Sequence, residues 1–312
     1  MKGELLVFSG SANPGLSAEI GRWLDVEVAP ATIKQFSDGE ISIKLNANCR
    51  GRDVFLIQPT SSPANDHLMQ MLLMLDAIRR ASAMRITVVL PYYGYGRQDR
   101  KSEPRVPISA RVVADLIEAM GPDRILCMDL HADQIQGFFR LPVDHLYAAP
   151  VFVEYIKARN FPDPVIVSPD SGGVERARFL ARQINAGLAI IDKRRPQANV
   201  SEIMHVIGDV DGRTCILYDD MIDTAGTISK GAQALKENGA ARVLACATHA
   251  VLSGQALERL QESVIDEVIL SNTIPIAAER KIDKITVLSV ARLVAEAIRR
   301  IHNEESVSSL FL

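Results

Sequence analysis

The chain has 312 residues, of which 47% are hydrophobic and 23% are charged, and its formal net charge at pH 7 is −3. This length exceeds what one ordinary hydrophobic core absorbs, so we expect two domains. The near-neutral charge predicts neither a nucleic-acid-binding surface nor a membrane-binding one. No apolar run approaches the roughly 18 residues of a membrane span, and the N-terminal sequence lacks the apolar core of a signal peptide.

The cysteines indicate neither disulfides nor a metal site. There are four of them, with no CxxC pair and no histidine at ligand spacing. They are Cys49, Cys127, Cys215 and Cys246. Isolated cysteines are typical of buried thiols in a reducing compartment, so we expect a cytoplasmic protein.

In chain order, short apolar runs alternate with longer segments of helical period. Runs rich in valine, isoleucine and leucine that are bounded by Asp, Gly or Pro predict strands covered on both faces. These runs are residues 5–10, 54–59, 86–91, 124–129, 165–170, 189–194, 215–220, 242–249 and 266–272. Strands that alternate with helices predict an α/β fold, with parallel sheets flanked by helices.

Three intervening segments predict buried or amphipathic helices. The methionine-rich residues 68–78 predict a buried helix. In residues 108–120 the predicted buried stripe consists of Val112, Val113, Leu116 and Met120. In residues 227–239 the corresponding stripe consists of Ile228, Ala232 and Leu235, and Gly239 follows as a predicted C-cap.

Two stretches of the chain resemble each other. Residues 51–67 align with residues 212–228: each has Gly-Arg, an apolar strand and a turn of small and polar residues, and each precedes a helix and a second strand. We expect two copies of one fold, with domains at residues 1–146 and 147–312 and a tail from about residue 296 that packs back on the first domain. The second copy alone carries acidic residues in the turn; the first has Gln58, Pro59 and Ser62 there.

That acidic turn, YDDMIDTAGT at residues 218–227, predicts a binding site for a phosphorylated sugar. Ligands of open parallel sheets bind beyond the carboxyl ends of the strands. The unpaired amides of the following helix start suit a phosphate, while Asp219 and Asp220 suit sugar hydroxyls or Mg²⁺. The plain alternative is a capping loop, in which Asp223 or Thr224 caps the helix.

With six further motifs, this loop resembles the ribose-phosphate pyrophosphokinase family of the phosphoribosyltransferase superfamily. The other motifs are residues 36–45, 91–101, 129–139, 167–178, 192–196 and 299–311. The resemblance implies two tandem phosphoribosyltransferase-like domains. It also implies transfer of the pyrophosphoryl group of Mg²⁺–ATP to ribose 5-phosphate, which gives phosphoribosyl pyrophosphate and AMP.

The resemblance assigns roles to individual residues. The catalytic residues that it implies are Lys193, Arg97 and Lys101. ATP would be bound by Asp38, Gly39, Glu40, Arg97, Gln98 and His131, and Asp38 and Glu40 would reach ATP on a neighbouring subunit. Ribose 5-phosphate would be bound by Arg195, Asp219, Asp220, Asp223, Thr224, Ala225, Gly226 and Thr227. The Mg²⁺ cofactor would be held by His131 and Asp170.

The resemblance also implies a homohexamer that is regulated by phosphate or ADP. The matching positions are Arg50, Ser82, Gln136, Asp144, Ser306, Ser308 and Phe311. The chain departs from the usual family pattern at Glu103, in the basic loop that begins at residue 91, and at Ser171 and Glu175. Glu103 puts the role of the loop beyond Lys101 in question.

Simpler interpretations of these residues and of the whole chain are also open. By local sequence alone, the basic segments 91–101 and 192–196 also fit solvated charged loops, and His131 fits a structural histidine at a strand end. A phosphoribosyltransferase would share the acidic loop but would not need the two basic segments. A non-catalytic regulatory homologue would keep the fold and lose parts of the site, whereas here Lys193, Asp170 and the basic loop are present.

Overall fold

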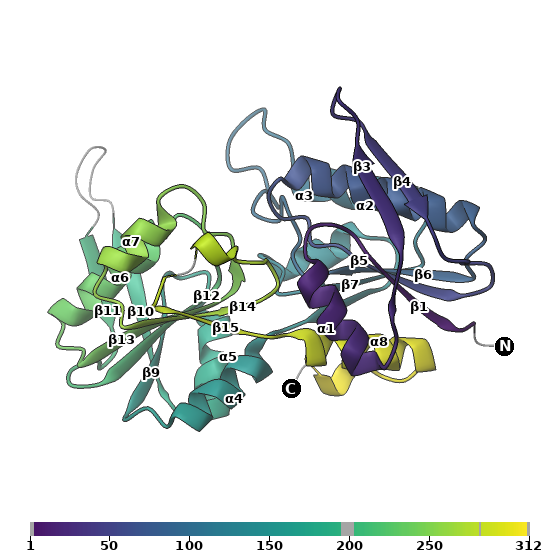
Figure 1. Ribbon diagram of the computed structural model, residues 1–312. Helices are drawn as coiled ribbons and strands as arrows, with labels where there is room; N and C mark the ends of the chain where they lie inside the picture. Colours follow the sequence, from purple (N-terminus) through teal and green to yellow (C-terminus); the bar gives the residue numbers. More distant parts are fainter. Residues whose placement is uncertain (1–2, 195–202, 281, 311–312) are drawn as a thin grey trace. The chain divides into compact units, whose positions relative to one another are not determined.

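The computed structural model describes residues 3–194, 203–280 and 282–310. The chain forms two compact units, and each is an α/β unit built on its own sheet (Figure 1). The first comprises Met1–Tyr147, Thr273–Pro275 and Ser289–Leu312. The second comprises Ala148–Asn272 and Ile276–Leu288.

The sheet of the first unit has six parallel strands in the order β2-β1-β5-β6-β7-β8. The strands are β1 (Leu5–Ser9), β2 (Val28–Ala29), β5 (Asp53–Ile57), β6 (Arg85–Leu90), β7 (Arg124–Met128) and β8 (Val143–Leu146). Helices α2 (Ala64–Arg80) and α3 (Ser109–Ala119) lie on one face. Helices α1 (Pro14–Leu24) and α8 (Ala291–Asn303) pack together on the other (Figure 1). The 3-10 turns η1 (Asp133–Phe138) and η3 (Ser308–Leu310) belong to the same unit.

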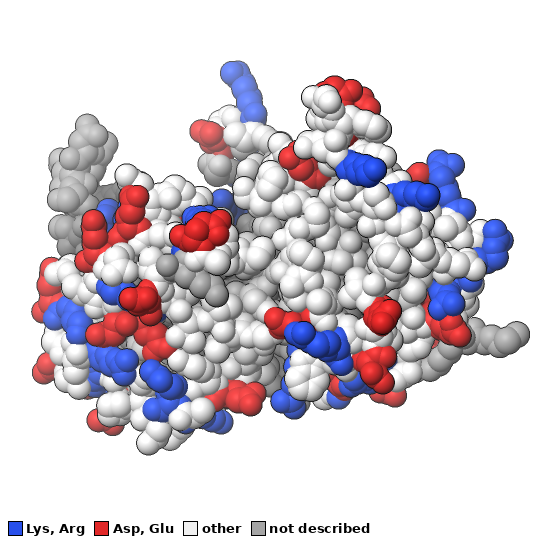
Figure 2. Space-filling model, viewed as in Figure 1, with Lys and Arg blue, Asp and Glu red and all other residues white. Residues whose placement is uncertain are grey.

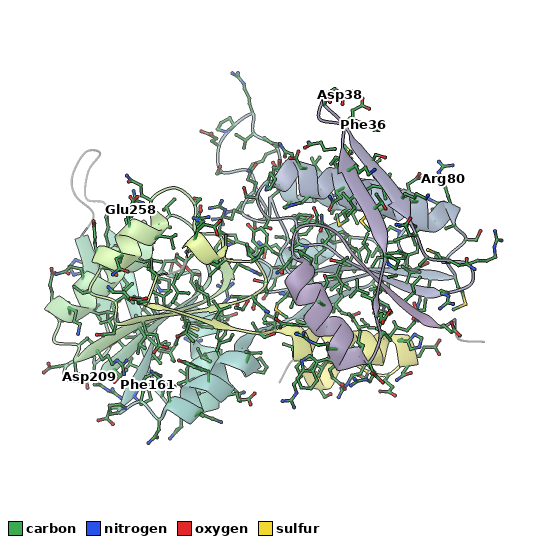
Figure 3. All side chains as sticks on the ribbon, viewed as in Figure 1. Phe36, Asp38, Arg80, Phe161, Asp209 and Glu258 are labelled. Atoms are coloured by element: carbon green, nitrogen blue, oxygen red, sulfur yellow. The ribbon has the colours of Figure 1, made fainter. Side chains whose placement is uncertain are left out.

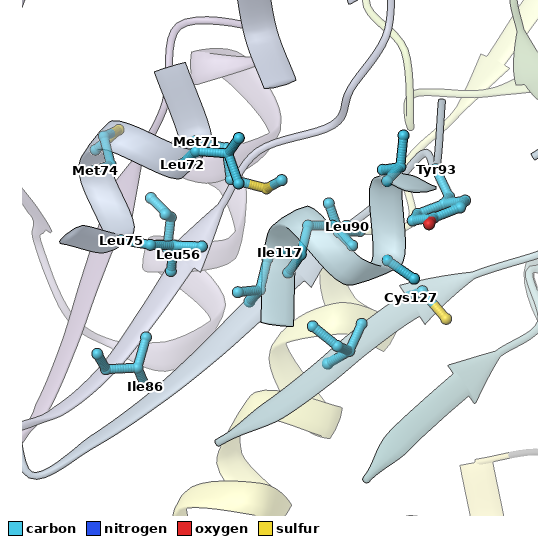
Figure 4. Close-up of a cluster of buried hydrophobic side chains, with 14 of the residues drawn as sticks. Leu56, Met71, Leu72, Met74, Leu75, Ile86, Leu90, Tyr93, Ile117 and Cys127 are labelled. Atoms are coloured by element: carbon cyan, nitrogen blue, oxygen red, sulfur yellow. The ribbon is translucent and has the colours of Figure 1, made fainter. Parts of the chain in front are cut away.

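Alternation along the strands supplies both faces of this sheet with apolar side chains. Val54 and Leu56 of β5 contribute to the core beneath α2 and α3, whereas the intervening Phe55 lies outside that cluster. Met71, Met74 and the other core residues of Figure 4 are fully or almost fully buried. Both faces are therefore closed to water, which explains the nearly continuous apolar sequence of the strands.

A separate antiparallel hairpin, β3 (Ala31–Gln35) and β4 (Ile41–Leu45), extends from the first unit. The Phe36 amide donates to the Glu40 carbonyl at 2.8 Å, which closes the turn. Gly39 has a φ of +95°, a conformation that favours glycine. Phe36 and Asp38 lie at the exposed tip (Figure 3).

The sheet of the second unit has seven strands in the order β11-β10-β9-β12-β13-β14-β15, and only β11 is antiparallel to its neighbour. The strands are β9 (Pro164–Ser168), β10 (Gly187–Arg194), β11 (Ile203–Ile207), β12 (Thr214–Ile222), β13 (Arg242–Ala250), β14 (Glu267–Ser271) and β15 (Ile285–Leu288). The helices are α4 (Ala149–Arg159), α5 (Val174–Ile184), α6 (Gly226–Glu237) and α7 (Ala256–Glu262), with the 3-10 turn η2 (Ala278–Arg280). Helices α6 and α7 cover one face of the sheet, and α4 and α5 cover the other (Figure 1).

These observations confirm the α/β fold and all nine predicted strands. The predicted repeat is confirmed in the topology, because β5 lies between β1 and β6 as β12 lies between β9 and β13. Ile228, Ala232 and Leu235 of α6 are buried, and Gly239 follows the helix with a φ of +90°. All four cysteines are buried free thiols. Within the described ranges, no helix combines the length and the apolar character that crossing a membrane requires.

The predicted stripe of α3 was wrong in part. Val112 and Leu116 are 52% and 42% exposed, whereas Val113 is buried as expected. The buried face is completed by Ala110, Ala114 and Ile117. The error arose because apolar residues occur on both sides of this helix, and the small alanines that pack closest to the sheet gave a weak hydrophobic signal.

Candidate active site

The acidic residues of the second unit lie near the C-terminal end of β12, where the strand extends beyond the pairing with its neighbour β9. Asp219 and Asp220 are consecutive, and the Asp220 amide donates to Oδ1 of Asp219 at 2.9 Å. Arg176 of α5 contacts both carboxylates. Its Nη1 lies 3.3 Å from Oδ1 of Asp219 and 3.1 Å from Oδ1 of Asp220.

The surroundings of this pair disfavour two full negative charges. Burial, and next the charge of Asp220, raise the pKa of Asp219 to about 8, and the Arg176 guanidinium opposes the rise. The Asp220 side chain is only 3% exposed. An arrangement that holds two carboxylates in so small a volume is suited to a ligand with several hydroxyl donors or to a cation.

The turn after β12 leads into α6 through one residue in the left-handed region. Ala225 has a φ of +60° and precedes Gly226, the first residue of the helix, and no side chain caps the helix there. The N-cap position of α6 is therefore occupied by Ala225 and not by Asp223 or Thr224. The first amides of α6 have no partner within the helix, and the helix dipole adds partial positive charge. This geometry suits a phosphate group.

A second loop, after β13, braces this turn. The Ser253 amide donates to the Asp223 carbonyl at 3.1 Å, and the Ser253 hydroxyl donates to the Asp223 carboxylate. Nη1 of Arg259 donates to the Thr224 carbonyl at 2.9 Å and lies near the start of α6, 3.7 Å from the point that a Cβ at Gly226 would occupy. Arg259 is exposed and places a cation beside the turn.

Asp170 lies between β9 and α5 in a tight loop. Its Oδ1 accepts hydrogen bonds from the amides of Gly172 at 2.9 Å and Gly173 at 3.1 Å. The Ser168 hydroxyl donates to the Asp170 carbonyl at 2.7 Å. The carboxylate is thus held by its own loop at the C-terminal end of β9, the same end of the sheet as the aspartates of β12.

The structure describes the backbone of Lys193 but not its side chain, and it does not describe Arg195. Lys193 belongs to β10, where it pairs with Met204 of β11. The predicted roles of Lys193 and Arg195 stay predictions.

The first unit brings Arg97, Gln98 and His131 into one region. A Cβ at Gly96 would lie 3.7 Å from the Cβ of His131, so the loop that carries Arg97 passes beside His131. Gln134 of η1 donates to Asp99 of the same loop at 2.6 Å. These contacts place an imidazole and exposed basic residues together at the C-terminal end of β7.

The base of the loop is fixed to α3. The Ala110 amide donates to the Gln98 carbonyl at 3.1 Å, and the Ser109 hydroxyl donates to the Gln98 side chain at 2.5 Å. Gly94 is buried, and a Cβ there would lie 2.3 Å from the Thr60 carbonyl oxygen. Its role in the structure is close packing.

Farther along the loop, Arg100, Lys101 and Glu103 are exposed. The hairpin residues Asp38, Gly39 and Glu40 are exposed too, and Oδ1 of Asp38 accepts the Glu40 amide at 3.0 Å. On the face shown in Figure 2, acidic and basic residues are interspersed, without a broad basic patch.

The predicted regulatory residues fall into three local groups of the first unit. Arg50 and Ser82 lie close together, because the amide of Gly51, the residue after Arg50, donates to the Ser82 carbonyl at 2.9 Å. Gln136 hydrogen-bonds to His145, next to Asp144, which is ion-paired with Arg124 at 2.7 Å. The Ser306 and Ser308 hydroxyls are hydrogen-bonded at 3.1 Å, and Phe311 lies outside the described residues.

Sequence reasoning did not find Arg176, Ser253 or Arg259. Arg176 lies within a motif that we had matched, at residues 167–178, but its partners are 43 and 44 positions away. Only the strand order brings these elements together. Ser253 and Arg259 lie in a segment with no motif, so the sequence offered no signal for them.

Comparison with known proteins agrees with this arrangement. Residues 5–121 match the N-terminal domain of ribose phosphate pyrophosphokinase, and residues 193–312 match the phosphoribosyl synthetase-associated domain. The ribose-phosphate pyrophosphokinase of Chromobacterium violaceum is 56% identical over 98% of this chain and 94% of its own length. That of Helicobacter pylori is 56% identical over 98% of this chain and 95% of its own.

A solved structure is similar over nearly the full length. Phosphoribosylpyrophosphate synthetase from Mycobacterium smegmatis superposes with a TM-score of 0.91 at 46% identity, covering 96% of this chain and 99% of that one. Coverage of this extent includes both units. The chain belongs to the ribose-phosphate pyrophosphokinase family.

Proposed function

We propose that this protein transfers the β,γ-pyrophosphoryl group of Mg²⁺–ATP to the C1 hydroxyl of ribose 5-phosphate, which gives phosphoribosyl pyrophosphate and AMP. The observation that carries the proposal is the β12–α6 turn. There the pair of carboxylates of Asp219 and Asp220, the diacid, lies shortly before a helix start that has no side-chain cap. In the reaction, the C1 oxygen attacks the β-phosphorus, the bond from that phosphorus to the oxygen on the α-phosphorus breaks, and the hydroxyl proton is released.

The second unit supplies the site for the sugar. The amides of residues 224–227 hold the 5-phosphate, with Arg195 as a further cation, and the Asp223 carboxylate is positioned by Ser253. Asp219 and Asp220 accept hydrogen bonds from the ribose hydroxyls. Because the sugar is held at both ends, its C1 hydroxyl is oriented for attack.

Basic residues lower the barrier by neutralising charge. Lys193, Arg97 and Lys101 stabilise the negative charge that develops on the oxygen that leaves with AMP. The base of the 91–101 loop is anchored at Gln98, while Lys101 is exposed, so closure of this part over the nucleotide is compatible with the fold. Asp38 and Glu40, at an exposed hairpin, bind ATP of a neighbouring subunit.

Asp170 and His131 would hold the Mg²⁺ ion. Asp170 would supply the carboxylate oxygen that this hard cation prefers, and such a cation usually shares its coordination with water and substrate phosphates. Among the residues that the structure describes, no group of three or more His, Cys, Asp or Glu side chains is arranged for a metal. A site completed by substrate phosphates fits that finding. When bound, Mg²⁺ neutralises phosphate charge and orients the triphosphate.

The experiment is a product assay with purified protein. We expect AMP and phosphoribosyl pyrophosphate in equal amounts, and only when ATP, ribose 5-phosphate and Mg²⁺ are all present. Omitting each component in turn, in phosphate-containing buffer, provides the controls. AMP without ribose 5-phosphate would indicate ATP hydrolysis, and no product at all would favour a regulatory homologue. Consumption of phosphoribosyl pyrophosphate with a free base would favour a phosphoribosyltransferase.

Assembly, regulation and location are parts of the same proposal. We place the nucleotide site in domain 1–146 and the sugar site in domain 147–312. The homohexamer would be regulated by phosphate or ADP at the residues from Arg50 to Phe311 that are named above. The buried free thiols support a reducing compartment, namely the cytoplasm.

A further inference from the structure

Arg176 lies between the two aspartates that we assign to the ribose hydroxyls. We infer that Arg176 is a positioning residue of this site: it holds Asp219 and Asp220 together as one acceptor for the sugar, without touching the sugar itself. This inference rests on the proposed function, and its test separates the two.

The geometry makes one nitrogen serve two carboxylates. Nη1 of Arg176 lies 3.3 Å from Asp219 Oδ1 and 3.1 Å from Asp220 Oδ1. The three side chains are 21%, 26% and 3% exposed. A pair so shielded from water interacts more strongly than an ion pair at the surface. The guanidinium therefore fixes the separation of the two acids.

Two adjacent buried carboxylates require such a partner. Like charges at this distance disfavour each other's ionised form, and burial adds to that effect. An arginine cannot lose its proton under physiological conditions, so its charge offsets the repulsion at every relevant pH. Ionised carboxylates are pure hydrogen-bond acceptors, and hydroxyl groups are donors to them. Arg176 thus favours the ionised state, which accepts a sugar, against the burial and repulsion that favour the protonated state.

The position of Arg176 also links two parts of the site. It is the third residue of α5, and α5 begins immediately after Gly173, whose amide donates to Asp170. Arg176, which holds the diacid, and the loop of Asp170, which we assign to Mg²⁺, therefore both lie at the start of α5. Through Arg176, the loop after β9 and the end of β12 have one fixed spacing.

Three variants test the inference. Arg176→Gln removes the charge and keeps a polar side chain of similar shape. Arg176→Lys keeps the charge on a narrower group. Arg178→Gln is the matched control, because Arg178 lies on the same helix and is exposed. Each is compared with the wild type in steady-state kinetics and in calorimetric binding of ribose 5-phosphate without ATP.

We expect Arg176→Gln to weaken ribose 5-phosphate binding by about tenfold to a hundredfold, as is typical when a hydrogen-bonded charge is lost. The KM for ribose 5-phosphate rises with it, and the KM for ATP changes less than about threefold, because the nucleotide site is intact. Arg176→Lys recovers part of the affinity. Arg178→Gln matches the wild type. A purely structural role would instead lower the melting temperature or the active fraction and leave the binding constant of the folded protein unchanged.

Other results would overturn the inference. Wild-type affinity and KM in folded Arg176→Gln would remove it and leave the proposed function standing. A wild type that neither binds ribose 5-phosphate nor forms AMP would remove both. If Arg176→Gln does not fold, Arg176→Lys decides: affinity equal to that of the wild type would show that the two-carboxylate geometry is not needed.

Discussion

Binding of ribose 5-phosphate should strengthen as pH rises, because the diacid of β12 is protonated in part before the sugar arrives. Burial and the charge of Asp220 raise the pKa of Asp219 to about 8. The proposed sugar contacts need ionised carboxylates. With a single proton to release, the apparent Kd falls by about tenfold between about pH 7 and pH 9 and then levels off. Because the acids are coupled, this proton belongs to the pair.

The raised pKa of Asp219 also makes the free energy of unfolding depend on pH. The direction of this dependence is opposite to that of an ordinary ion-paired carboxylate. A carboxyl whose folded pKa lies above its unfolded value of 3.8 binds more protons in the folded state. Its contribution to stability is therefore largest below the unfolded value and is lost as pH rises through about 8. In the ligand-free protein this group lowers stability at alkaline pH, and ribose 5-phosphate should offset part of that loss.

Isothermal titration calorimetry measures the pH dependence of binding. Titrations at pH 7, pH 8 and pH 9, in two buffers of different ionisation enthalpy, give the binding constant and the number of protons released. Work above about pH 7 keeps the substrate phosphate, with its own pKa of about 6, largely ionised. Asp219→Asn is the control and should bind more weakly with little dependence on pH. A constant Kd from pH 7 to 9 with no proton release by the wild type would refute the reasoning.

Two further predictions concern other contacts. Arg259→Gln should raise the KM for ribose 5-phosphate by about tenfold, since a hydrogen bond to the phosphate turn and a nearby cation are both lost; unchanged kinetics would contradict this. Asp53→Asn should lower the free energy of unfolding by about 2 to 3 kcal/mol, because the buried carboxylate pairs with Arg85 and His302 at 2.5 Å and 2.7 Å. Thermal unfolding checks this against Asp76→Asn, which removes only an exposed ion pair with Arg80 within α2 and should change the stability much less.

The strands were predictable because both faces of each sheet are covered. A strand such as β5 is buried at every residue, and after Asp53 its residues 54–57 form a continuous apolar run. The two-residue β2 and the hairpin β3–β4 lack such runs, and no strand was predicted there or at the partly exposed β15.

The site was predictable in its loops and not in the contacts between them. The turn at 218–227 carries its chemistry in consecutive residues, so its acids and its helix start could be read directly. Arg176 joins this turn only because β9 and β12 are neighbours in the sheet, and pairing order is not encoded in either segment alone. The same holds for Arg259, which reaches Thr224 across 35 positions.

The two copies of the fold show why the sugar site occurs in one of them. In the repeat, Gln58 takes the place of Asp219 at the end of the equivalent strand. Gln58 is fully buried; its Oε1 accepts the Ala12 amide at 3.2 Å, and its Nε2 donates to Gln70 at 2.7 Å and to the His67 carbonyl at 3.2 Å. A neutral amide that is satisfied by the protein on both ends stabilises its own turn and offers nothing to a ligand. Two adjacent carboxylates differ from this amide, because hydrogen bonds from a sugar relieve the repulsion between them. The same topology thus supports folding in one copy and binding in the other.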